Sequence, residues 1–257
     1  MFEAKMSEVS VLKKIVEAIK DIVNVVNIEV GLSGFSFQAM DLSHVALVSL
    51  SLKPDCFQSF NCDNSTHLGI KLQNLHKILK CADSTDIITM SCENDPQQLN
   101  FKFESQRHDK LSQFTLNLMM QEDEQLQIPS TTYSSRITMP SAEFARIVRE
   151  LSQLSEGVKI TTSKKSITFT VNSEVVNGEM ELRGNNSDKI GEQIRIDVDE
   201  PVSNSFSLNF LNSFTKATSL SESVNLFLSD GTPLVVEYQI GDSGSLKYYL
   251  APKMSED

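Results

Sequence analysis

The chain has 257 residues, with 23 Lys or Arg against 34 Asp or Glu, which gives a formal net charge of −11. Hydrophobic residues make up 40% of it, enough for a folded core, so a largely disordered chain is excluded. No apolar run approaches the roughly 20 residues of a membrane-spanning helix, and the four cysteines are too scattered for a disulfide framework. The acidic balance argues against a protein that reads DNA grooves with a basic surface. We therefore expect a soluble, intracellular, acidic globular protein without a membrane partner.

Four segments show apolar residues at helical spacing. In the first of them, Val9, Leu12, Val16 and Ile19 form one stripe. Ser141 is expected to cap the third helix, because a serine oxygen can accept a hydrogen bond from a free amide of the first turn. The expected helices lie at residues 7–21, 71–81, 141–152 and 208–217.

Short segments rich in β-branched and aromatic residues separate the helices and predict strands. Few short helices among many alternating strands indicate an α+β fold, in which helices cover one face of antiparallel sheets. The expected strands lie at residues 34–39, 46–52, 87–92, 99–104, 113–118, 167–171, 224–228, 234–239 and 246–251.

The two halves of the chain repeat the same pattern. Any two amphipathic helices look alike, but two matching pairs in the same order favour a duplication. We expect an N-terminal domain at 1–118, an extended connector at 119–133 and a C-terminal domain at 134–257. The matching positions are Leu12, Ile15, Val16 and Ile19 with Phe144, Ile147, Val148 and Leu151, then Leu72, Leu75 and Ile78 with Leu208, Leu211 and Phe214.

No catalytic, cofactor or metal motif is present in the sequence. It lacks a P-loop, a dinucleotide fingerprint and the G-x-S-x-G and H-E-x-x-H patterns. Cys56, Cys62, His67 and His76 miss the usual zinc spacing. We expect no catalytic residues, no metal and no cofactor. A hydrolase would need carboxylates that converge only in space.

Basic residues lie opposite the apolar stripes of the expected helices. For a single helix a solvated polar face is the simpler interpretation, and Glu17 supports it. The recurrence in both halves favours sequence-independent contact with phosphates. A net charge of −11 makes such a surface a weak anchor. A closed ring with basic helices inside would hold DNA without gripping it.

Four stretches resemble proliferating cell nuclear antigen, the eukaryotic sliding clamp family, and the similarity runs from Phe2 to about Lys253. They are Asp41-Leu-Ser-His-Val, Lys77-Ile-Leu-Lys-Cys81, Glu143-Phe-Ala-Arg-Ile-Val-Arg149 and Leu246-Lys-Tyr-Tyr-Leu-Ala-Pro252. The resemblance implies the DNA clamp fold, with two similar domains per subunit and a homotrimeric, six-domain ring around duplex DNA.

The same resemblance implies a nuclear processivity factor for replicative DNA polymerase, without enzymatic activity. It would serve as a docking platform for replication and repair proteins. The implied partners are the clamp loader, DNA polymerase delta, flap endonuclease, DNA ligase and other proteins with a short hydrophobic-aromatic docking motif.

The resemblance assigns DNA-facing roles to eight basic residues. Gln153 and Asn209 stand where relatives can carry a basic residue, so we expect fewer positive charges on the DNA-facing surface. The expected DNA-facing residues are Lys13, Lys14, Lys20, Lys77, Lys80, Arg146, Arg149 and Lys216.

A second surface implied by the resemblance is a hydrophobic pocket for partner peptides. Leu126 and Ile128 are apolar residues in an acidic connector, where they need a partner or a groove. Val45 and Leu47 could equally be ordinary core residues. The expected pocket comprises Met40, His44, Val45, Leu47, Leu126, Ile128, Pro129, Pro233, Tyr249, Ala251 and Pro252.

Subunit contacts in this family pair two edge strands, expected here at Lys110–Leu116 and Val175–Glu181. The expected contact residues are Cys81, Lys110, Phe114, Leu116, Leu151, Leu154, Val175 and Gly178. Lys164 matches the family's ubiquitin and SUMO acceptor, although Lys165 is its neighbour.

One alternative belongs to a different functional class. It is a DNA-free interaction scaffold, such as a checkpoint-type relative that assembles with other subunits. Self-assembly separates the two hypotheses, since only the clamp forms a homotrimer.

Overall fold

The computed structural model describes residues 1–93, 97–119, 131–185 and 192–253. The chain forms two compact units. The first comprises Met1–Leu42, Val48–Gln127 and Ile240–Leu246, and the second comprises Ser43–Leu47, Ile128–Gln239 and Lys247–Asp257.

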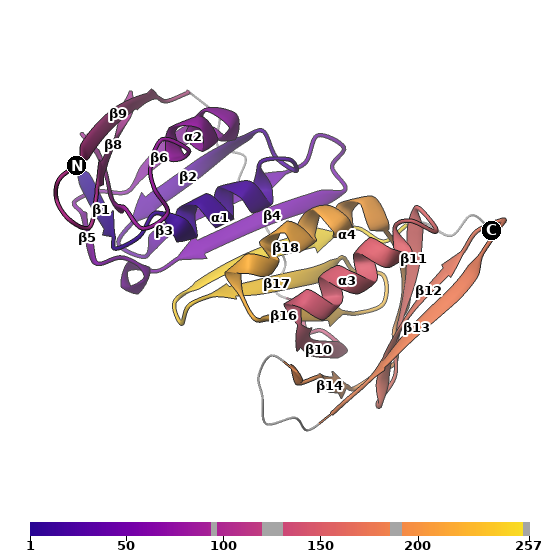
Figure 1. Ribbon diagram of the computed structural model, residues 1–257. Helices are drawn as coiled ribbons and strands as arrows, with labels where there is room; N and C mark the ends of the chain where they lie inside the picture. The colour runs from indigo at the N-terminus through magenta and orange to yellow at the C-terminus, as the bar shows by residue number, and fades with distance from the viewer. Residues whose placement is uncertain (94–96, 120–130, 186–191, 254–257) are drawn as a thin grey trace. The chain divides into compact units, whose positions relative to one another are not determined.

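The described residues contain four α-helices, two in each half of the chain (Figure 1). In the first unit α1 packs against α2, and in the second α3 packs against α4. The helices are α1 (Ser10–Ile19), α2 (Leu72–Leu79), α3 (Ser141–Leu151) and α4 (Leu208–Phe214), with short 3-10 helices at η1 (Pro54–Cys56) and η3 (Thr215–Leu220).

The strands follow in chain order around these helices. The N-terminal half contributes β1 (Phe2–Met6), β2 (Val25–Gly31), β3 (Gly34–Met40), β4 (Ala46–Leu52), β5 (Ser59–Cys62), β6 (Thr66–Lys71), β7 (Ile87–Cys92), β8 (Gln98–Glu104) and β9 (Leu111–Asn117). The C-terminal half contributes β10 (Ser135–Pro140), β11 (Gly157–Thr162), β12 (Ser166–Asn172), β13 (Asn177–Arg183), β14 (Arg195–Val198), β15 (Ser203–Ser207), β16 (Ser223–Leu228), β17 (Leu234–Ile240) and β18 (Gly244–Leu250).

The strand orders of the two halves repeat one another. The N-terminal half forms the orders β5-β1-β7-β8-β9 and β4-β3-β2-β6. The C-terminal half forms β14-β10-β16-β17-β18 and β13-β12-β11-β15, the same two orders with every strand number raised by nine. Neighbouring strands are antiparallel, for example Phe2 opposite Cys92 and Ile137 opposite Leu226. The predicted α+β fold with a duplicated unit is therefore confirmed.

Each unit has its own hydrophobic core beneath its helices. The eight helix residues used to detect the repeat in α1 and α3 have exposed fractions of 8% or less. Burying a side chain of this size contributes about 1.5–3 kcal/mol, so these stripes fix which face of each helix points inward. In the second unit Phe214 of α4 also stacks on Tyr248, with ring centroids 4.4 Å apart.

The boundaries of the helices differ from those predicted. The first helix begins at Ser10 rather than residue 7, because the preceding residues connect it to β1. Ser141 is not the N-cap of α3: Pro140 occupies that position and Ser141 is the first helical residue. Its Oγ is buried and has no hydrogen-bond partner among the described residues.

Candidate nucleic-acid interface and docking surfaces

The predicted basic residues of the first unit lie on α1 and α2 or directly after them. Lys14 and Lys77 are exposed within these helices, and Lys80 is exposed at the end of α2. Lys13 and Lys20 are only partly exposed. The opposite faces of both helices are buried, so the lysines that reach solvent share the outward side.

Two of these lysines interact with groups of the protein itself. The Nζ atom of Lys13 donates a hydrogen bond of 2.6 Å to the carbonyl oxygen of Ala82, which ties α1 to the segment after α2. The Nζ atom of Lys20 lies 3.3 Å from Glu17 and 3.2 Å from Asp21. Burial alone would lower the pKa of Lys20, but hydrogen bonds with Asp21 and Glu17 outweigh it and raise the pKa. Both lysines are thus less available to a ligand than Lys14.

The basic residues of α3 are balanced by acids on the same helix. Arg146 donates to Glu143 at 3.0 Å and to Glu150 at 3.1 Å, one turn to either side. The hydrogen bond with Glu143, followed by the charges of both glutamates, raises the pKa of Arg146. Arg149 is exposed in the last turn. Spacings of three and four residues could have revealed these pairs in the sequence.

Lys216 lies outside α4, contrary to the expected helix 208–217. The α-helix ends at Phe214 and continues as the 3-10 helix η3, where Lys216 is exposed. Hydroxyl groups explain the change, because Thr215 Oγ1 donates to the Asn212 carbonyl at 2.7 Å and Thr218 Oγ1 to the Thr215 carbonyl at 2.6 Å. Such local bonds compete with the regular α-helical pattern.

Part of the predicted peptide pocket is brought together in the second unit. The amide of Ala251 donates to the Val45 carbonyl at 3.0 Å. Val45, Ala251, Pro252 and Tyr249 are partly exposed, and burial raises the pKa of Tyr249.

The remaining members of the predicted pocket are distributed as follows. Leu47 is 8% exposed, which favours the core interpretation that the sequence left open. His44 and Pro233 are exposed in the second unit, and Met40 is partly exposed at the end of β3 in the first. Leu126, Ile128 and Pro129 lie outside the described residues.

The two strands predicted for subunit contacts each stand at an end of their strand order. β9 neighbours only β8, and β13 neighbours only β12 within the described chain. The strands run Leu111–Asn117 and Asn177–Arg183, so each starts later than predicted and Lys110 and Val175 precede them.

The side chains predicted at these edges differ in exposure. Val175 is 90% exposed and Leu154, after α3, is 40% exposed, whereas Leu151 and Leu116 are buried in their own units. Cys81 and Lys110 are exposed, and Phe114 and Gly178 are partly exposed.

Lys164 lies in the turn between β11 and β12. Ser163 holds this turn: its amide donates to the Ser166 carbonyl at 2.8 Å, and its Oγ accepts from the Ser166 amide at 3.0 Å. Lys164 and Lys165 are both exposed.

Within the described residues, no group of three or more His, Cys, Asp or Glu side chains is placed to hold a metal ion. Cys56, Cys62, His67 and His76 all belong to this part of the chain, so they form no such group. In the same residues no helix is long and apolar enough to cross a membrane.

A duplicated α+β unit with basic residues on the helices of both halves is consistent with the class of two-domain sliding clamps. The family model for the N-terminal domain of proliferating cell nuclear antigen matches residues 1–126, and that for the C-terminal domain matches residues 127–253. The chain is also 45% identical, over the full length of both sequences, to proliferating cell nuclear antigen of Chaetomium thermophilum.

The chain belongs to the proliferating cell nuclear antigen family. It is a DNA sliding clamp, which assembles as a homotrimer, encircles duplex DNA and acts as a processivity factor in replication and repair. Polymerase, flap endonuclease and ligase dock on it.

The hydrogen bond between Lys13 and Ala82 predicts different effects for two neighbouring lysines. Lys13→Met keeps the aliphatic stem but leaves the Ala82 carbonyl without this donor, so the free energy of unfolding should fall by about 1 kcal/mol. Lys14→Met, on the exposed side of α1, should change it by less than about 0.5 kcal/mol. Urea unfolding followed by circular dichroism measures both, and equal midpoints would show that the bond contributes nothing.

Proposed function

We propose that the outward faces of the four helices form the DNA-facing surface of the clamp. The observation that carries this proposal is the repeat: in both units the helices bury an apolar stripe and basic residues lie on the solvent side. In the first unit these residues lie on α1 and α2 or directly after them, and in the second unit they lie on α3 and on η3, which follows α4. The proposed contacts are with phosphates, because lysine and arginine without aromatic partners offer charge rather than base recognition. The residues are Lys13, Lys14, Lys20, Lys77, Lys80, Arg146, Arg149 and Lys216.

These eight residues would contribute unequally. Lys14, Lys77, Lys80, Arg149 and Lys216 are exposed and would make the main contacts. The intrahelical acids beside Lys20 and Arg146 compete with phosphates for those cations. A lining of this kind attracts DNA weakly, which suits a ring that must move along the duplex.

Reversing exposed charges on three helices tests the DNA-facing assignment. The variant Lys14→Glu, Lys77→Glu and Arg149→Glu should shorten polymerase products on a long primed template by about tenfold, because each lost phosphate contact weakens attraction and each new carboxylate repels.

The matched control reverses three exposed basic residues outside the helices: Lys53, Arg107 and Lys159. This control carries the same net charge and should support normal product lengths. Light scattering should give a trimer for both proteins. Polymerase products of normal length with the helix variant would contradict the DNA-facing assignment.

We propose further that the residues near Val45 and Ala251 form the docking pocket for partner peptides. The hydrogen bond between their main chains places the segment after β3 beside the C-terminal segment, and Tyr249 offers a partly exposed aromatic ring. Aromatic side chains of this kind often dominate peptide binding. The proposed set comprises Met40, His44, Val45, Leu47, Leu126, Ile128, Pro129, Pro233, Tyr249, Ala251 and Pro252.

Truncating Tyr249 should weaken partner peptides without affecting assembly. Tyr249→Ala is expected to raise the dissociation constant of a hydrophobic-aromatic docking peptide about tenfold, as measured by calorimetry. Phe210→Ala removes a partly exposed aromatic ring from α4 of the same unit and should leave the peptide affinity unchanged. Equal affinities for wild type and Tyr249→Ala would contradict the pocket.

The subunit interface is proposed to pair β9 of one subunit with β13 of the next. Within the described chain each strand has a neighbour on one side only. Its other edge presents main-chain N–H and C=O groups that can pair with a strand of another subunit. Two exposed apolar side chains lie on or beside these strands: Leu111 in β9 is 56% exposed, and Val175, two residues before β13, is 90% exposed. Leu154, after α3, is a further exposed apolar residue at 40%. The proposed contacts are Cys81, Lys110, Phe114, Leu116, Leu151, Leu154, Val175 and Gly178.

Placing a charge at this edge should dissociate the trimer. Leu154→Lys with Val175→Lys should raise the concentration at which the trimer falls apart by at least about tenfold, since two apolar contacts become desolvated ammonium groups. A dilution series followed by light scattering measures this. Leu32→Lys is the control, because Leu32 is 84% exposed but lies between β2 and β3. An unchanged trimer in the double variant would exclude this interface.

Family membership supports several further proposals. We propose a nuclear location, no enzymatic activity, and Lys164 as the modified lysine, with its neighbour Lys165 as the alternative. We also propose loading by a clamp loader and docking of DNA polymerase delta. The domain limits proposed are 1–118 and 134–257, joined by a connector at 119–133.

A further inference from the structure

A basic hollow lies in the second unit, and none of the described residues that line it belongs to one of the four α-helices. It has a volume of 510 Å³ and is bordered by the turn between β11 and β12, the end of β13 and the start of β14. Four cationic side chains line it: Lys164, Lys165, Arg183 and Arg195. Among the described residues that line it there is no acid, although the chain as a whole carries −11.

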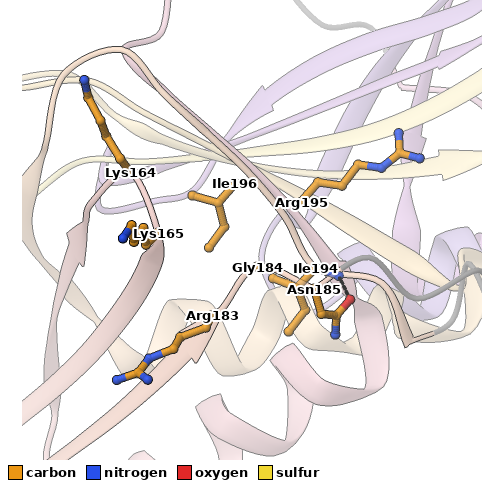
Figure 2. Close-up of a pocket in the computed structure, with 8 residues that line it drawn as sticks. All are labelled: Lys164, Lys165, Arg183, Gly184, Asn185, Ile194, Arg195 and Ile196. Atoms are coloured by element: carbon orange, nitrogen blue, oxygen red, sulfur yellow. Dashed lines mark hydrogen bonds between the residues drawn. The ribbon is translucent and has the colours of Figure 1, made fainter.

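The centre of this hollow is apolar. Figure 2 shows Ile194 and Ile196 among the basic side chains, while the charged ends of Lys164, Arg183 and Arg195 point outward in different directions. Both isoleucines are partly exposed, so their side chains can still lose water to a ligand. The arrangement is an apolar floor with a basic rim.

One main-chain hydrogen bond and two bonds of the Asn185 side chain hold the walls of the hollow in place. The amide of Gly184 donates to the Lys165 carbonyl at 3.2 Å, which joins the turn to the end of β13. The side chain of Asn185 accepts from the Ile194 amide at 3.0 Å and donates to the Glu192 carbonyl at 3.0 Å. The floor and rim therefore need little rearrangement before a ligand binds.

We propose that this basic hollow is a docking site for a short acidic peptide segment with an aliphatic residue at its centre. The aliphatic side chain would lie on Ile194 and Ile196, and acidic residues on either side would face the rim. An extended peptide advances about 3.3 Å per residue, so its acidic residues are spread along its length and do not converge on one point. The carboxylates of the segment would be attracted to this basic rim and repelled by the rest of the protein, since the chain as a whole carries a net charge of −11, and this contrast would orient the segment.

A lone phosphate group fits this geometry less well. Tight phosphate sites direct several donors at one point, whereas the charged ends here diverge. A nucleic-acid strand would use the cations but leave the isoleucine floor unused. Arg183 also forms an ion pair with Glu181, with 2.9 Å between Nη2 and Oε2. Because this pair weakens the attraction of Arg183 for a ligand, a ligand that contacts several of the cations is favoured over one that depends on Arg183 alone.

The test uses the full-length trimer and fluorescence anisotropy. The probe is a labelled octapeptide with two central valines and three acidic residues on each side. Arg183→Glu with Arg195→Glu should weaken its binding about tenfold or more, since two attractions become repulsions. Arg195→Gln alone should weaken it less, and the affinity should fall as salt is added.

The control variant is Lys53→Glu with Lys159→Glu, which makes the same charge change at exposed positions that are not among the described residues lining the hollow. It should bind the probe within about twofold of wild type. Circular dichroism and light scattering confirm folding and trimer formation for each protein. Neither variant alters Lys164, so the result is independent of the modification proposed there.

Two further ligands complete the experiment. A peptide with glycines in place of the valines should bind more weakly, and an eight-nucleotide oligothymidylate should bind more weakly than the valine peptide. Equal losses in both double variants would overturn the proposal. So would equal affinity for the glycine peptide, or tighter binding of the oligonucleotide.

Discussion

The burial of one apolar stripe on each helix is the constraint on which the other surfaces depend. Because Leu12, Ile15, Phe144 and Ile147 are buried, the opposite faces of α1 and α3 must lie in solvent. The same packing positions α2 and α4 beside them in their own units. The strand orders around the two helix pairs correspond, so the same local fold exposes basic residues once in each unit.

Weak attraction is built into the proposed DNA-facing surface. Glu143 and Glu150 neutralise Arg146, and Glu17 shares Lys20 with Asp21. A clamp of this family does not depend on tight contacts, since the closed ring itself prevents escape. Strong binding would instead slow movement, because every step along the duplex would break several ion pairs. Acids beside the cations are thus compatible with function, although they look like a defect in a conventional DNA-binding protein.

The sequence predicted the helices, whose apolar residues recur at regular spacing. It missed the features that depend on how strands pair, such as the basic hollow. The helix stripes were predictable because they repeat every three to four residues. β13 has only Met180 and Leu182 as large apolar residues, so its pattern alone indicates little. The hollow was invisible because Lys165 and Arg183 meet only through the register that sets Ser166 opposite Arg183. Arg195 joins them from β14, a strand too short to detect.

The two edge strands of the proposed interface, β9 and β13, belong to different units. If β9 pairs with β13 as proposed, the contact is heterologous, because it joins different surfaces of the two subunits. In the homotrimeric ring of this family, two subunits joined by one such contact leave one β9 and one β13 unpaired, and the third subunit pairs with both. A chain with one damaged edge could still join through the other, and it would terminate the assembly as an open arc. Such a chain would act as a dominant-negative subunit, because it would prevent ring closure by intact copies in the same cell.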